Sequence, residues 1–173
     1  PDSWSRPFCS SCSSFFYLSN AYDVRLTHRG AGVEHNAKIF AKVESLYRLI
    51  HKAGSKGSGA GQFSDPNGVA IDSEGHIVVA ETRNNQVQVL RADGTHVRTI
   101  GSKGSGAGQF QSPFGVAIDG VGQIVVADSD NHRVQVVGGA GTHGRTNGPT
   151  GRGAGQYQSP VGVAIGGGGR LGG

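Results

Sequence analysis

Cysteine is scarce in this sequence, which has two cysteines, Cys9 and Cys12, among 173 residues. They stand close together in the tetrapeptide CSSC, and such a pair cannot staple a chain of this length. A secreted scaffold built on disulfides is therefore excluded. Long apolar runs are also missing, because each apolar stretch extends over only a few residues, and this excludes a transmembrane helix. No signal peptide is recognisable either.

A strong charge of either sign is lacking too. The chain has 16 Lys and Arg against 12 Asp and Glu, a net charge of +4, and its isoelectric point is near 9.4. This mild basic excess is compatible with nucleic-acid binding but indicates it only weakly. Methionine is absent: the chain begins with Pro1 and stops inside a repeat. We therefore expect a fragment of a longer protein.

Glycine, in contrast, is abundant, and much of it belongs to a repeat. There are 31 glycines, well above the usual share of about 7%. The decapeptide GSKGSGAGQF occurs at 54–63 and again at 101–110, a step of 47 residues, and GQY at 155–157 continues the same step. Only three of 18 positions differ between residues 55–72 and 102–119. A fixed period of this length predicts a repeat architecture.

Each repeat contains the signals of four short strands. The first two are GVAID at 68–72 and 115–119 and IVVA at 77–80 and 124–127; the third is VQVL at 87–90 or VQVV at 134–137. In the first repeat a turn at Asp93-Gly94 precedes a fourth strand that ends at Ile100. Because IVVA is apolar on both faces, each sheet should be covered on both sides. The predicted fold is all-β, with four-stranded antiparallel blades of a partial β-propeller.

Residues 1–53 lack this period and are predicted to be an irregular lead-in. Within it, Ile39, Val43, Leu46 and Ile50 follow a helical spacing, which predicts a helix over 37–51. An alternative comes from the repeat register, which places 50–53 where the strand 97–100 stands one repeat later. The predicted domains are thus 1–53 and 54–173, the latter divided into repeats 54–100, 101–147 and a truncated 148–173.

Residues 108–137, GQFQSPFGVAIDGVGQIVVADSDNHRVQVV, closely resemble an NHL repeat, with Asn131-His132-Arg133 at the signature position; residues 61–90 carry Asn84-Asn85-Gln86 there. The resemblance implies about two and a half blades of a six-bladed propeller, similar to the C-terminal NHL domain of tripartite-motif ubiquitin ligases, which carry RING and B-box zinc modules. It implies a cytoplasmic, non-catalytic module that recruits a protein or single-stranded RNA, with substrate recognition for a ligase as its use. The alternative is a fragment of a propeller enzyme of the peptide-amidating lyase type.

The chain departs from the repeat pattern near its end. Gly166 stands where Asp72 and Asp119 stood, and Gly144 and Asn147 replace Val97 and Ile100. Because glycine and asparagine are poor strand formers, we expect the fourth strand of the second repeat to be frayed. An incomplete propeller would also leave apolar faces open, which predicts self-association.

The candidate binding site is a set of basic and amide side chains in loops. In a propeller, the loop between the second and third strands opens on the same face as the connection between blades. That face would carry Lys56, Arg83, Asn84, Lys103, Asn131, His132, Arg133 and Arg152. Arginine and asparagine can contact phosphates and base edges, although a protein partner is favoured over RNA. The alternative is a solvated loop face, partly neutralised by Glu81, Asp128 and Asp130.

No catalytic residue, metal site or cofactor is predicted. A zinc site would need Cys9, Cys12, His28 and His35, whose spacing differs from that of a zinc finger. Asp72 and Asp119 are expected to accept hydrogen bonds from the turns that follow them. His96 and His143 are expected to be polar residues at strand starts. GSKGSGAG lacks the phosphate-loop pattern and is expected to be a turn-rich connection.

Overall fold

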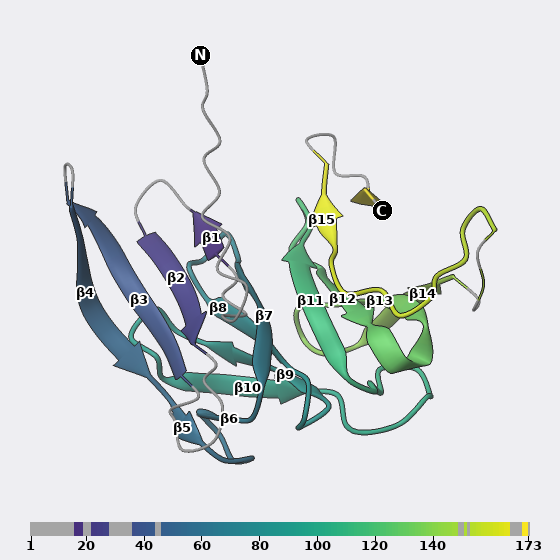
Figure 1. Ribbon diagram of the computed structural model, residues 1–173, viewed down its shortest axis with the longest axis horizontal. Helices are drawn as coiled ribbons and strands as arrows, with labels where there is room; N and C mark the ends of the chain where they lie inside the picture. The colour runs from purple at the N-terminus through teal and green to yellow at the C-terminus, as the bar shows by residue number, and fades with distance from the viewer. Residues whose placement is uncertain are drawn as a thin grey trace.

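The computed structural model describes residues 16–18, 22–27, 36–43, 46–148, 151, 153–166 and 171–172, with side chains described for 51–148, 151 and 153–166. The described part is almost entirely β-structure. Three four-stranded sheets follow one another along the described chain, with a short two-stranded sheet after them (Figure 1). A helix long and apolar enough to cross a membrane is not found among these residues.

The first sheet lies in the predicted lead-in. Its strands are β1 (Phe16–Leu18), β2 (Tyr22–Thr27), β3 (Asn36–Val43) and β4 (Leu46–Ala53), paired antiparallel in that order. The predicted helix over 37–51 is therefore wrong, and so is the irregular lead-in from residue 16 onward. The helical prediction failed because a spacing of four residues, as between Ile39 and Val43, fits one face of a strand as well as one face of a helix. The alternative from the repeat register is confirmed, since 50–53 belong to β4.

The second and third sheets repeat each other with the 47-residue step. The second contains β7 (Pro66–Ile71), β8 (Ile77–Glu81), β9 (Gln86–Leu90) and β10 (His96–Ile100). The third contains β11 (Pro113–Ile118), β12 (Ile124–Asp128), β13 (Arg133–Val137) and β14 (His143–Asn147). Both are meanders with neighbouring strands antiparallel. Every residue of β8 and β12 is buried, as a sheet covered on both faces requires.

The sheets stand side by side as blades. We refer to β1–β4 as blade 1, β7–β10 as blade 2 and β11–β14 as blade 3; they fan out from left to right in Figure 1. The first strands lie innermost, because β7 contacts β11, and β11 contacts β15 (Ala164–Ile165). The last strand, β16 (Leu171–Gly172), pairs with β15. Blades that stack face to face around their first strands form part of a β-propeller.

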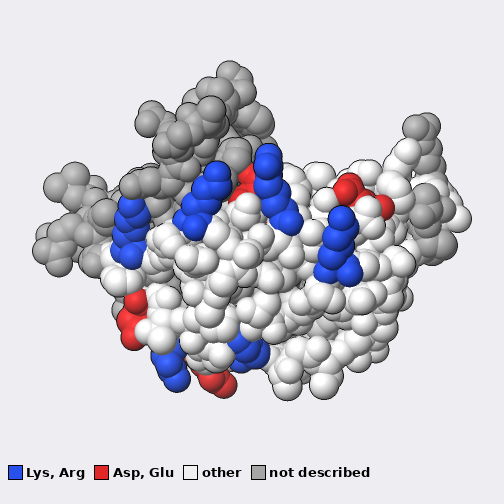
Figure 2. Space-filling model, turned by 90° about the horizontal axis from the view of Figure 1, so that it is seen from below, with Lys and Arg blue, Asp and Glu red and all other residues white. Residues whose placement is uncertain are grey.

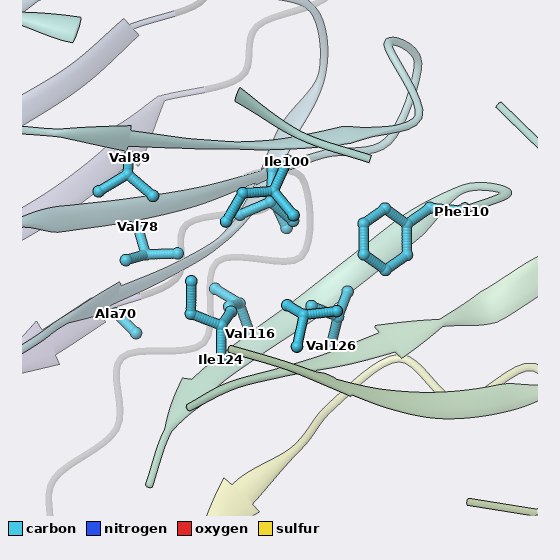
Figure 3. Close-up of a cluster of buried hydrophobic side chains, with 11 residues drawn as sticks. Ala70, Val78, Val89, Ile100, Phe110, Val116, Ile124 and Val126 are labelled. Atoms are coloured by element: carbon cyan, nitrogen blue, oxygen red, sulfur yellow. The ribbon is translucent and has the colours of Figure 1, made fainter. Parts of the chain in front are cut away.

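The apolar core lies between the blades. Figure 3 shows Ala70, Val78 and Ile100 of blade 2 pointing toward Val116 and Ile124 of blade 3. Each connection adds one aromatic ring to such a core: Phe110 between blades 2 and 3, and Phe63 on the opposite face of blade 2. These rings explain the start of GSKGSGAGQF. Gly101 has φ +83°, and an added Cβ there would lie 2.4 Å from the ring of Phe110, so glycine alone leaves room for the ring.

The outer strand of blade 3 is present. β14 pairs with β13 over Val134↔Asn147 to Val137↔His143, so the expectation of a frayed strand is wrong for the backbone. The reason for that expectation does appear in the packing, because four of the five residues of β14 are exposed while β10 ends in the buried Ile100. The far face of blade 3 is covered by the third repeat, whose Tyr157, Val163 and Ile165 pack against Val125, Val134 and Val136.

Candidate functional site

Two kinds of loop meet on one face of the blades, as predicted. The connection to blade 2 runs through β5 (Ser55–Lys56) and β6 (Gln62–Phe63), and the Nδ2 amide of Asn84 in the β8–β9 loop donates to the carbonyl oxygen of Gly57 at 2.9 Å. One repeat later, Asn131 donates to Gly104 at the same distance. Asn131 belongs to the short 3₁₀ turn Ser129–Asn131. Each asparagine therefore joins the loop between the second and third strands of its blade to the connection that leads into that blade.

A buried carboxylate organises each of these loop pairs. Asp128 is fully buried. Its Oδ1 accepts the backbone N–H of Gln111 at 2.6 Å. Its Oδ2 accepts hydrogen bonds from Asn131 at 2.9 Å, from Arg133 at 2.8 Å and from Gln135 at 3.1 Å. Four donors surround one charge, which satisfies a group that would otherwise be costly to bury.

Glu81 is the counterpart in blade 2 and is equally buried. Its carboxylate accepts the N–H of Ser64 at 3.0 Å and the side-chain amides of Asn84, Gln86 and Gln88 at 2.6, 2.9 and 2.7 Å. Gln86 occupies the position that Arg133 has one repeat later. The same loop is thus built once around a neutral donor and once around an arginine.

Arg133 is used inside the fold. Its side chain is only 13% exposed. Besides Asp128, it donates to the carbonyl oxygens of Ser105, Gly106 and Gln109 at 2.6, 2.8 and 2.8 Å. Its donors are therefore directed at the connection and not at solvent.

Arg83 differs from Arg133. Its side chain is 72% exposed, and its Nε donates to Oδ2 of Asp65 at 2.9 Å. The repeat step shows that Asp130, not Arg133, is the counterpart of Arg83, because 83 + 47 = 130. Sequence reasoning grouped the two arginines by their shared loop and missed this offset.

His132 and Asn85 each accept a hydrogen bond from the backbone of the following repeat, and we call these two contacts clasps. Nδ1 of His132 accepts the backbone N–H of Ser159 at 3.0 Å, and Oδ1 of Asn85 accepts that of Ser112 at the same distance. Both acceptors have positive φ, 54° in each case. Thr82 completes the joint between blades 2 and 3, since its hydroxyl donates to the carbonyl oxygen of Pro113 at 2.9 Å. Sequence reasoning placed His132 on the binding face and did not foresee this clasp.

Lys56 and Lys103 are the predicted cations that stay exposed without a structural task in the described residues. Arg152 lies outside the described residues. Figure 2, which looks at the molecule from below, shows Lys and Arg as separate groups with uncharged surface between them and with acidic groups on the same face. A continuous basic patch is not seen in this view.

The remaining polar candidates make hydrogen bonds within the fold. Asp72 accepts the N–H groups of Glu74 and His76, and Asp119 accepts those of Val121 and Gln123, so the turn interpretation is confirmed. The ring of His96 forms a hydrogen bond with the hydroxyl of Thr99, and the ring of His143 forms the equivalent hydrogen bond with Thr146. The described residues contain no group of three or more His, Cys, Asp or Glu side chains that could hold a metal ion. The zinc candidates Cys9, Cys12, His28 and His35 lie outside them.

The first strands of successive blades enclose a recess of about 430 Å³. It is lined by residues 68–71, 115–118 and 161–165, all of them Gly, Val, Ala or Ile. The strands come close because glycines face each other: a Cβ on Gly68 would lie 2.3 Å from the carbonyl oxygen of Phe114. A lining of this composition can accept apolar groups, whereas it offers no titratable side chain for catalysis.

The two arginines give a direct test of this geometry. Arg133→Gln should lower the free energy of unfolding by about 1–2 kcal/mol, because charge-assisted hydrogen bonds to the connection are lost while an amide at this position still reaches the carboxylate, as Gln86 does. Arg83→Gln should change it by about 0.5 kcal/mol or less, because the pair with Asp65 is exposed. Urea unfolding of both variants measures the difference. Equal effects would contradict the internal role of Arg133.

The sheet order, the 47-residue step and the turn chemistry agree with one family of repeats. A comparison with protein families matches the NHL repeat to residues 63–90 and 110–137. These two segments are NHL repeats. They cover β8 and β9 of blade 2 and β12 and β13 of blade 3 together with the innermost strand of each. The predicted resemblance is therefore confirmed.

Relatives with curated descriptions match about a quarter of this chain. The B-box type zinc finger protein ncl-1 of Caenorhabditis elegans is 46% identical over 43 residues, which are 25% of this chain and 5% of that protein. The E3 ubiquitin-protein ligase TRIM71 of Rattus norvegicus is 45% identical over 42 residues, 24% of this chain and 5% of the ligase. Protein lin-41 of C. elegans is 40% identical over 44 residues. The match thus spans a small part of each relative's length.

Solved structures show the fold over a longer stretch. The catalytically inactive H270A virginiamycin B lyase from Staphylococcus aureus superposes with a TM-score of 0.62 at 13% identity, covering 93% of this chain and 48% of the lyase. A streptogramin B lyase superposes with a TM-score of 0.60 at 16% identity, covering 94% of this chain and 47% of that one. At this identity the likeness shows the propeller architecture alone. The described chain thus has the fold of part of a propeller.

Proposed function

We propose that this chain is a non-catalytic interaction module whose ligand is a protein. The observation that carries the proposal is the use of the loop-face donors inside the fold. Asn84, Asn131 and Arg133 all donate to backbone carbonyls or buried carboxylates. The groups that could hold phosphates and read bases are thus engaged elsewhere, and single-stranded RNA is the weaker candidate.

The recess supports binding over catalysis. Its walls are apolar side chains and backbone from three successive repeats, which suits the apolar side chains of a protein partner. The alternative, a lyase of the peptide-amidating type, would need histidines that converge on the channel, and the residues lining the recess are Gly, Val, Ala and Ile. In a longer protein similar to TRIM71, the bound protein would be the ligase substrate, and ubiquitin transfer would reside outside the NHL repeats.

The cytoplasm is the proposed compartment, because the sparse cysteines suit a reducing environment.

Self-association is a further part of the proposal. Among the described residues, the large apolar side chains that are exposed are Val121 and Val161, at 82% and 56%. Light scattering after gel filtration tests association: a concentration-dependent dimer or larger species is expected, and a monomer at all micromolar concentrations would contradict it.

The choice between RNA and protein can be tested on the full chain. We expect labelled single-stranded RNA to bind weakly, with a log–log salt slope of about −2 or shallower, because two or three exposed cations release few counterions at roughly 0.7 per phosphate. Lys56→Ala with Lys103→Ala should make this slope shallower without changing stability. Filter binding across a salt series measures both. Tight RNA binding with a steep slope that survives the double substitution would overturn the protein proposal.

A further inference from the structure

The outer edges of the two blade joints are built alike, from a turn that rests on the end of the preceding blade's outer strand. In the joint between blades 1 and 2, the turn of residues 91–95 rests on the end of β4: a Cβ on Gly94 would lie 2.5 Å from that of Ala53 and 3.0 Å from Nε2 of His51. One repeat later, the turn of residues 138–142 rests on the end of β10, where a Cβ on Gly141 would lie 3.6 Å from Ile100. Both turns are closed by the same hydrogen bond, from residue 91 to 95 and from 138 to 142.

The two joints differ in their charges. In the first, Asp93 carries a carboxylate at the tip of the turn, with His51 of blade 1 nearby. The pKa of Asp93 is lowered first by the hydrogen bond from the backbone N–H of Thr95, with smaller contributions from Arg91 and His51. The 47-residue step puts Arg98 in the place of His51 and Ala140 in the place of Asp93. The second joint has gained a permanent cation and lost the carboxylate.

Arg98 is consequently left without a partner in the described part of the chain. Its Nε is buried and has no hydrogen-bond acceptor there. One of its terminal nitrogens, Nη2, lies next to the turn, 3.9 Å from where a Cβ on Gly139 would be. A buried donor that makes no hydrogen bond is costly and uncommon in folded proteins. Ala140, at the tip of the same turn, is exposed.

We propose that Arg98 and the turn of residues 138–142 form a docking position for a carboxylate, supplied by an Asp or Glu side chain of a partner protein. In the first joint a carboxylate and an imidazole lie near each other at this place, and the two terminal nitrogens of a guanidinium match a carboxylate with two parallel hydrogen bonds. The exposed tip at Ala140 leaves the approach open. That the carboxylate comes from a protein rests on the proposed function. The carboxylate site at Arg98 does not.

The site is tested first with acetate as the probe. The Nε–H resonance of Arg98 in the ¹⁵N-labelled full chain, assigned by its loss in Arg98→Lys, should shift saturably as acetate replaces chloride at constant ionic strength. In Ala140→Asp the tethered carboxylate should compete, weakening acetate binding by about tenfold. Arg145, one repeat later on β14, is the matched control and should not saturate. A linear shift shared by both arginines, or a response to inorganic phosphate without one to acetate, would overturn the carboxylate site.

A stability measurement gives an independent reading. Ala140→Asp should raise the melting midpoint by a few degrees, but an aspartate there could also stabilise the turn by itself, as Asp93 does through Thr95. The combination with Arg98→Gln separates the two effects, because the gain should largely disappear when the cation is absent. An equal gain with and without Arg98 would contradict the proposal. If acetate binds Arg98 and Arg98→Gln leaves the binding of a protein partner unchanged, the carboxylate site stands while its use by that partner falls; loss of all protein binding by the unsubstituted chain would instead contradict the proposed function.

Discussion

Gly68→Ala is expected to lower the free energy of unfolding by about 3 kcal/mol or more, in spite of adding a single methyl group. The new Cβ would lie 2.3 Å from the carbonyl oxygen of Phe114 and 2.9 Å from the backbone nitrogen of Val116. Both atoms belong to the backbone of β11 and cannot rotate away. Strands β7 and β11 would have to separate, which would loosen the core between blades 2 and 3.

The repeat provides two matched controls for this substitution. Gly115→Ala is expected to be less severe, because its Cβ would meet the carbonyl oxygen of Val161 at 2.8 Å. Gly162→Ala should be close to neutral, since no described atom lies within 4 Å of its Cβ. Urea unfolding followed by circular dichroism measures all three midpoints. Three equal losses would show that an intrinsic preference for glycine, and not the approach of the inner strands, decides these positions.

Asp128→Ala is expected to cost about 3–5 kcal/mol, because it removes the acceptor of a buried ion pair while the donors stay. Arg133, Asn131 and Gln135 would lose their common partner, and so would the backbone N–H of Gln111. Asp128→Asn should cost less, since one oxygen is retained, although its amide would face other donors.

The control for this prediction is Asp130→Ala, two residues further on and exposed. Its loss removes a hydrogen bond from the hydroxyl of Ser112 and should cost about 1 kcal/mol or less. Thermal and urea unfolding of both variants test the contrast. A small effect of Asp128→Ala would mean that the connection between blades 2 and 3 keeps its shape without the carboxylate, against the hydrogen-bond network described above.

The sequence predicts the fold well where a second copy constrains the interpretation. The period places β8 and β12, whose apolar residues on both faces require covered sheets, and the turn aspartates Asp72 and Asp119 follow from it. Blade 1 has no near-identical copy, and there the spacing of Ile39 and Val43 could not distinguish a helix from a strand. The register that relates 50–53 to 97–100 contained the correct answer, because strand position in a repeat is fixed by the neighbouring unit.

The candidate site was less predictable because residue type does not show where a side chain points. Arg133 and Arg83 look equivalent as cations in one loop, yet one is turned inward onto Asp128 and three carbonyl groups while the other is exposed. A signal was present: Gln86 stands in the place of Arg133, and an amide and a guanidinium share only the ability to donate hydrogen bonds. The common acceptor for these donors is a buried carboxylate, Glu81 in one repeat and Asp128 at the same place in the next.

The clasps at Asn85 and His132 have a consequence for how the molecule comes apart. Ser112 has φ 54° just before Pro113, a conformation rare for residues other than glycine, and the side chain of the preceding repeat holds its N–H. When one blade unfolds, the next blade loses the hydrogen bond that restrains this backbone. Unfolding should therefore spread from each blade to its neighbour, as in a one-dimensional chain of coupled units. Amide exchange should accordingly show protection that falls stepwise toward β14, where the outer strand has little packing to hold it.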